Sequence, residues 1–218
     1  HLSDPTGLAL SYETLWLFYR GDLDRNDVSA VSQLFAEAPH GVQDRESLIR
    51  SGVLDALLPP ERAERALALA AHLLEREDHF PEEGDLNFRD VHREWMPLEE
   101  RWSLRQRWMG PTNDLPGALW GLYLQTGSGR MWALARRHLR HLLAADICHD
   151  AEPSQMQHAD PRRRKLPGGF GDHETPLHWH STCHVNDRFA RLRALAWSYY
   201  LTGDHRAREA ALLWAHAA

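Results

Sequence analysis

Two stretches of the sequence share one pattern that decides the fold: Leu119-Trp120-Gly121-Leu122-Tyr123-Leu124-Gln125-Thr126-Gly127 and Ala196-Trp197-Ser198-Tyr199-Tyr200-Leu201-Thr202-Gly203-Asp204. Both are largely apolar and contain Thr-Gly, where glycine can adopt the left-handed conformation that closes a helix. Each is followed by a second run with apolar residues at helical spacing, residues 132–143 and 207–214 respectively. The sequence therefore predicts two helical hairpins that turn at Gly127 and Gly203.

The segment upstream of the repeat is expected to contain one strand and connecting helices. Residues 8–19 mix alternation with aromatic side chains and end at the turn signal Arg20-Gly21-Asp22, which favours a strand. Apolar residues recur at helical spacing over residues 27–35 and again over 60–77, the second run opening with Pro-Pro-Glu. We therefore expect a strand followed by helices in this part of the chain.

A change of character near residue 84 indicates a domain boundary. The acidic stretch 75–85 contains proline and glycine and is typical of a solvated connection. We therefore expect two domains, residues 1–84 and residues 85–218, the second of them helical. Within the second, residues 146–181 form a connection far longer than the usual link between packed helices, and such long segments are usually functional.

Composition and charge limit the classes of protein to consider. With 43% apolar and 26% charged residues the chain is an ordinary folded protein, and its formal net charge of −6 argues against nucleic acid as a partner. No apolar run is long enough for a membrane-spanning helix. Two cysteines, Cys148 and Cys183, are too few for a disulfide framework, so the compartment stays open. Because the sequence starts at His1 and stops at Ala218 inside an apolar periodic run, we expect N- and C-terminal parts of its own chain to be missing.

Histidine clustering is the main indication of a site. Of 15 histidines, eight lie between residues 138 and 184: His138, His141, His149, His158, His173, His178, His180 and His184. Imidazoles titrate near neutral pH and serve as bases, acids or metal ligands. His178, His180, Cys183 and His184 could in principle hold a metal, but they match no standard metal spacing, so we expect no metal or cofactor. Calcium stays open, although the sequence does not indicate it. The alternative is that these are hydrogen-bonded loop residues.

Three further segments have both a functional and a structural interpretation. Asn113 and Asp114 open the first hairpin, where they either bind a ligand or cap the helix. Trp95, Trp102 and Trp108 either form a sugar-stacking surface or belong to the core. The basic run over residues 162–165 either grips an acidic polymer or is solvated, and short charge runs favour the solvated state.

The order of these pieces resembles the exo-rhamnogalacturonan lyase family, which is similar to polysaccharide lyase family 26. The likeness covers most of the chain from about Leu8 onward. The segments that carry it, in order, are residues 86–90, 113–120, 126–127, 145–149, 168–169, the histidine-rich segment 173–184, and 199–204. Two departures are the absence of the last hairpins and of an aspartate after Thr126-Gly127, where Ser128 stands instead.

The resemblance implies a mainly α fold: an incomplete (α/α) toroid of helical hairpins, preceded by a short β-containing remnant of an upstream β domain. It also implies β-elimination on rhamnogalacturonan or another uronic-acid-containing pectin, so the expected partner is an acidic polysaccharide or oligosaccharide. Neither nucleic acid nor a membrane is expected.

β-Elimination needs a base for the C5 proton, a group that neutralises the carboxylate and an acid for the leaving O4. We expect His184 to be the base, with Arg188 one helical turn later facing the carboxylate. The expected catalytic residues are His178, His180, His184 and Tyr199. The expected substrate-binding residues are His92, Asn113, Asp114, His149, His173, Trp179 and Arg188.

The geometry of this expected site has one weak point. His178, His180 and His184 should converge with Asn113 and Tyr199 at one open end, but Tyr199 would lie some 20 Å into its helix at 1.5 Å per residue.

Two other functions remain open on the sequence. A glycoside hydrolase needs two carboxylates, for which the histidine-rich segment offers only Asp172 and Glu174. A non-catalytic carbohydrate-binding domain would use the same groove without turnover. In that case His184 would cap or pack, and Arg188 would be a surface charge.

Overall fold

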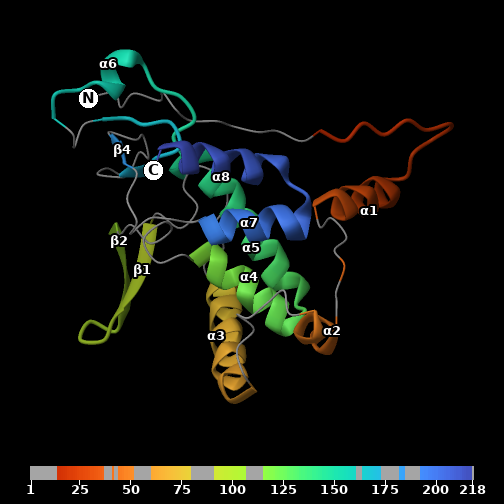
Figure 1. The fold of residues 1–218 in the computed structure, drawn as a ribbon. Helices are drawn as coiled ribbons and strands as arrows, with labels where there is room; N and C mark the ends of the chain where they lie inside the picture. The colour runs from red at the N-terminus through yellow and green to blue at the C-terminus, as the bar shows by residue number, and fades with distance from the viewer. Residues whose placement is uncertain are drawn as a thin grey trace.

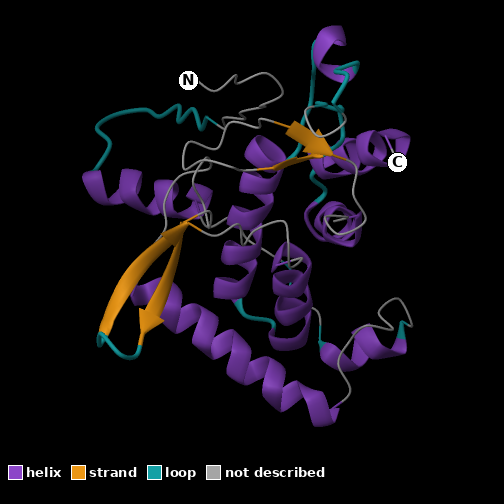
Figure 2. Ribbon diagram, turned by 90° about the vertical axis from the view of Figure 1, so that its left-hand side faces the viewer, coloured by secondary structure: helices purple, strands orange, loops and turns teal. Residues whose placement is uncertain are grey.

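Helices dominate the structure, a computed structural model that describes residues 14–36, 41, 44–51, 60–79, 91–106, 115–160, 164–172, 182–184 and 192–217 (Figures 1 and 2). The helices are α1 (Arg25–Ala36), α2 (Arg45–Arg50), α3 (Pro60–His79), α4 (Leu115–Thr126), α5 (Gly129–His141), α6 (Pro153–Met156), α7 (Leu192–Thr202) and α8 (His205–Ala217). A π-helical turn, η1 (Leu142–Asp146), extends α5. The strands are β1 (Val91–Met96), β2 (Arg101–Gln106), β3 (Phe170–Asp172) and β4 (Thr182–His184).

Both predicted helical hairpins are present, and they turn at the predicted glycines. Gly127 has a φ of 66° and Gly203 a φ of 71°, values that favour a residue without a β-carbon. The amide of Gly127 donates to the carbonyl of Tyr123 at 2.7 Å, and the amide of Gly203 donates to the carbonyl of Tyr199 at 2.8 Å. The two turns therefore have the same backbone hydrogen bond at the same place.

A capping side chain also follows each of the two turns. Ser128 accepts a hydrogen bond from the amide of Met131 at 3.4 Å and begins α5. Asp204 accepts from the amide of Arg206 at 3.0 Å beside the first residues of α8. Serine and aspartate are both preferred N-cap residues. Ser128 therefore caps its helix at the position where the family pattern has an aspartate after Thr-Gly.

The hairpins pack against each other through α4 and α7. The indole Nε1 of Trp120 donates to Ser198 Oγ at 2.7 Å, and both side chains are fully buried. Gly121 lies next to the Trp197 ring, because a β-carbon at residue 121 would already be 3.6 Å from it. The small residues Gly121 and Ser198 thus let α4 and α7, which both carry aromatic side chains at this contact, approach each other closely.

The hydrophobic core lies between α3, α4, α5, α7 and α8. At its centre, Trp120 contacts Trp132 edge-on with ring centroids 5.2 Å apart, and Tyr123 lies 5.0 Å from the same Trp132 ring. Ala66 and Ala70 of α3 are buried in this core. Helix α3 therefore packs on the first hairpin, although the two lie on opposite sides of the domain boundary expected between residues 84 and 85. That boundary stays a prediction.

Three local predictions about the upstream part have clear outcomes. The helices expected over residues 27–35 and 60–77 are confirmed as α1 and α3. The connection expected from residue 75 is wrong in its first part, because α3 continues to His79. The strand is wrong over Thr14 to Tyr19: no described strand pairs with this stretch, and a strand needs a neighbour for its backbone hydrogen bonds. Residues 8–13 lie outside the described part.

Two strand pairs were not expected from the sequence. Strands β1 and β2 form an antiparallel hairpin in a region expected to be helical, with Trp95 directly opposite Trp102. The long connection 146–181 was expected to be a loop, yet it contains α6 and β3, and β3 pairs with β4 just beyond its end. The alternation of polar and aromatic residues over 85–95 was the signal for the first pair.

Candidate functional site

The candidate site is built where three segments meet near the end of η1. The amide of Cys148 donates to the carbonyl of Gly169 at 2.9 Å, and the amide of Gly168 donates to the carbonyl of Cys148 at 2.7 Å. One residue after Gly169, Phe170 begins β3 and pairs with His184 of β4. These backbone bonds join the end of the π turn, β3 and β4 into one network.

This network places two of the expected site residues near each other. His149 follows Cys148, and His184 stands opposite Phe170. His184 is the last residue of strand β4, so the expectation that it lies one helical turn before Arg188 is wrong. Residues 173–181 of the histidine-rich segment lie in sequence between Asp172 and Thr182, which are paired with each other. For β4 the structure describes the backbone only, so it gives the position of His184 and not its side chain.

Most of the other expected site residues lie outside the described part of the chain. They are Asn113, Asp114, His173, His178, Trp179, His180 and Arg188. His92 is described as a backbone position in β1, where it stands opposite Arg105. The expectation that the histidines converge with Asn113 therefore stays a prediction.

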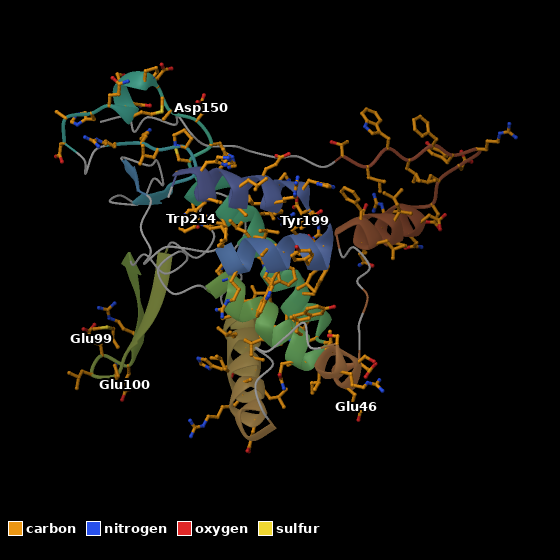
Figure 3. All side chains as sticks on the ribbon, viewed as in Figure 1. Glu46, Glu99, Glu100, Asp150, Tyr199 and Trp214 are labelled. Atoms are coloured by element: carbon orange, nitrogen blue, oxygen red, sulfur yellow. The ribbon has the colours of Figure 1, made fainter. Side chains whose placement is uncertain are left out.

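Tyr199 lies at the turn of the second hairpin. Its ring is 5.3 Å from the ring of Tyr200 and 5.6 Å from the ring of His205, the first residue of α8. Trp214 is nine residues further along α8, about 14 Å at 1.5 Å per residue, and its backbone lies against Gly168. Figure 3 shows Tyr199 and Trp214 at opposite ends of the α7 and α8 pair. Tyr199 is therefore separated from the loop that leads into β3.

Gly168 fixes that loop against α8. Its φ is +85°, and a β-carbon on it would lie 2.4 Å from the carbonyl oxygen of Leu213 and 2.8 Å from the amide nitrogen of Trp214. Only glycine fits both the left-handed conformation and the close approach. The entry to β3 is thus held by α8 on one side and by Cys148 on the other.

The π turn η1 extends α5 with five buried residues. The amide of Ile147 donates to the carbonyl of Leu142 at 3.1 Å, the hydrogen bond that spans five residues in a π helix. Such turns are rare and are often found at functional sites. No pattern in the sequence distinguishes this turn from a continued α-helix.

A buried group of ionisable residues lies in the π turn and in the last turn of α5 before it. His141 Nε2 is 3.5 Å from Asp146 Oδ1, and each residue is 1% exposed. His138, one turn earlier on α5, is also buried. None of the three is without a partner. Of the eight clustered histidines, the four whose side chains the structure describes divide into two kinds: His138 and His141 belong to the core, whereas His149 and His158 are half-buried in the loop beyond it.

His149 is the best-described member of the expected site. Its Nε2 is hydrogen-bonded to the carbonyl oxygen of Leu143 at 2.5 Å, and its side chain is half-buried. Leu143 belongs to η1, so this imidazole satisfies one of the carbonyls left open at the helix end. The structure thus gives His149 a defined orientation.

The basic run near residue 165 is not simply solvated. Lys165, the one lysine of the chain, is 3% exposed, and its amide donates to the carbonyl of Gln155. Arg164 is half-buried, and its Nε donates to the carbonyl of His158 at 2.9 Å. The solvated interpretation is therefore wrong for Lys165, because this residue is buried. Arg162 and Arg163 lie outside the described residues.

No group of three or more histidine, cysteine, aspartate or glutamate residues with a metal-binding arrangement occurs within the described ranges. Among the same residues, no helix has the length and apolar character needed to cross a membrane. Comparisons with protein-family models, with curated proteins and with solved structures found no match. The family relationship expected from the sequence therefore stays a prediction.

Proposed function

We propose that this protein is a polysaccharide lyase that cleaves rhamnogalacturonan, or a related pectin containing uronic acid, by β-elimination. The observation that carries the proposal is the backbone network that joins His149, β3 and β4, because it brings His149 near the strand position of His184 at the base of the histidine-rich segment. Imidazoles can move protons at neutral pH without a pair of carboxylates, as this reaction requires.

The helical framework gives independent support. The two hairpins repeat the same turn, each turn is followed by a capping side chain, and α4 packs directly on α7. Hairpins that repeat and pack side by side are the unit from which an (α/α) toroid is built. We therefore propose that the chain forms part of such a toroid, with the substrate at the end where β3 and β4 lie.

In the proposed reaction His184 or a neighbouring histidine removes the C5 proton of the uronate. Arg188 neutralises the carboxylate, which acidifies that proton. His178 or His180 protonates the leaving O4 oxygen, because Tyr199 lies at the other end of the α7 and α8 pair. His92, Asn113, Asp114, His149, His173 and Trp179 complete the proposed contacts with the sugar.

The test of this proposal is an assay for the unsaturated uronate that β-elimination leaves behind. The protein is mixed with rhamnogalacturonan, and ultraviolet absorbance of the new C4=C5 double bond is followed. A steady rise supports the lyase. An unchanged absorbance while the polymer shortens supports the hydrolase that Asp172 and Glu174 would serve, and an intact polymer that binds the protein supports a binding domain.

Substitution of His184 tests its role within the reaction. His184→Ala is expected to lower turnover by about two to four powers of ten, the range usual for a lost general acid or base, while the protein stays folded. Turnover and the unfolding temperature are measured together. Near-normal turnover with a lower unfolding temperature would show that His184 is structural.

A further inference from the structure

The hydrogen bond of His149 determines which of its ring nitrogens is available. A carbonyl oxygen can only accept, so the Nε2 that faces Leu143 at 2.5 Å must carry the hydrogen. In the neutral ring the other nitrogen, Nδ1, is then unprotonated. This tautomer is the one that can take a proton at Nδ1 without releasing the backbone bond.

The His149 side chain is partly exposed. Leu143 is buried, whereas the His149 side chain is only half-buried, so the ring joins the buried π turn to the surface. The structure records no partner for Nδ1 among the described residues. Asp150, the next residue, is exposed, and the buried Asp146 pairs with His141 on the other side of Ile147.

We propose that His149, through Nδ1, is the base of the β-elimination, an inference that rests on the proposed function. Nδ1 takes the proton from C5 of the uronate, and the electron pair of the C5–H bond forms the C4=C5 double bond. The C4–O4 bond breaks, and the leaving O4 takes a proton from water or from an acid of the histidine-rich segment. The imidazolium then returns its proton to water, so no further reactant is consumed.

This role differs from the one expected on the sequence, where His149 only binds substrate and His184 is the base. A fixed tautomer favours His149, because a base must present an unprotonated nitrogen in a held orientation. His184 then assists the leaving group from the neighbouring strand. The hydrogen bond to Leu143 becomes the contact that positions the base.

A variant that separates capping from proton transfer is His149→Gln. The glutamine amide can donate to the carbonyl of Leu143, but it cannot accept a proton at neutral pH. The matched control is His216→Gln: His216 Nδ1 is bonded to the carbonyl of Leu212 at 2.6 Å, and this exposed ring lies near the end of α8. Both variants therefore exchange a histidine that donates to a backbone carbonyl.

The proposal predicts that H149Q lowers kcat on rhamnogalacturonan at least about 100-fold with KM within about twofold, whereas H216Q retains both constants. A raised KM with unchanged kcat would return His149 to substrate binding and overturn the proposal, and so would unchanged kinetics. If the wild-type protein produces no unsaturated product at all, the proposed function fails. If it does produce this product while H149Q is fully active, only the role of His149 fails.

A second measurement does not depend on how the variant folds. Nitrogen NMR of the labelled wild-type protein should show His149 as the Nε2–H tautomer. An Nδ1–H tautomer would overturn the assignment.

Discussion

Gly168 is the residue on which the entry to the candidate site depends most. Gly168→Ala adds a β-carbon that overlaps the backbone of α8, in a conformation that side chains disfavour. Overpacking and the left-handed conformation together should lower the free energy of unfolding by about 2–4 kcal/mol. Urea unfolding measures this loss.

The control for Gly168 is Gly203→Ala, which has a φ of +71° but nothing within 4 Å of the added carbon. Gly203→Ala should lower the free energy of unfolding only by the cost of the left-handed conformation, about 1 kcal/mol. Equal losses at Gly168 and Gly203 would mean that the loop does not pack on α8 as the structure has it.

Asp204 makes the second hairpin sensitive to acid. Burial raises the pKa of Asp204, but its hydrogen bonds and ion pair with Arg206, together with the charge of Arg136, outweigh burial and lower the pKa below its ordinary value of 3.8. A carboxyl whose pKa is lower in the folded state contributes stability above 3.8 that is lost as the pH falls through the folded-state value.

Asp204→Ala should therefore lower the free energy of unfolding by about 1 kcal/mol at neutral pH, the usual loss of an N-cap. The difference from the wild type should shrink as the pH falls below 3.8. Thermal unfolding at several pH values measures it, with the exposed Asp22→Ala as the control. A difference that grows on acidification would contradict the assigned direction of the pKa shift.

At the scale of elements, the contact between α4 and α7 depends on one buried hydrogen bond. Ser198→Ala leaves the indole N–H of Trp120 without its acceptor in a fully buried place. An unsatisfied buried donor should lower the free energy of unfolding by about 1–3 kcal/mol.

A double-mutant cycle with Trp120→Phe measures this bond. Phenylalanine has no N–H to satisfy, so Ser198→Ala should cost less in the Trp120→Phe background than in the wild type. Additive losses would show that the two helices do not meet through this pair.

The hairpins could be predicted because their signal is local. Helical spacing and the Thr-Gly turns act within a few residues of Gly127 and Gly203, and both turns formed as expected. The strand over Thr14 to Tyr19 failed because pairing depends on a distant partner that local alternation does not reveal. The β3 and β4 pair was missed for the same reason. In addition, each of these strands has only three residues, too few to show an alternating pattern.

At the scale of the whole molecule, the fold class was predictable and the details of the site were not. The mainly helical class follows from the repeat. The division of the histidines into a buried pair, His138 and His141, and the half-buried His149 depends on how α5 ends in a π turn. No feature of the sequence distinguishes that turn, so the position of His149 required the structure.

The most direct test of the central claim is the mass of the products released from rhamnogalacturonan by the wild-type protein. β-Elimination breaks the C4–O4 bond without adding water, so each new non-reducing end should be an unsaturated uronate, lighter by one water than the product of hydrolysis. The account predicts these unsaturated oligosaccharides, together with their strong reduction in H149Q. Saturated products that carry the added water, or an intact polymer, would contradict it.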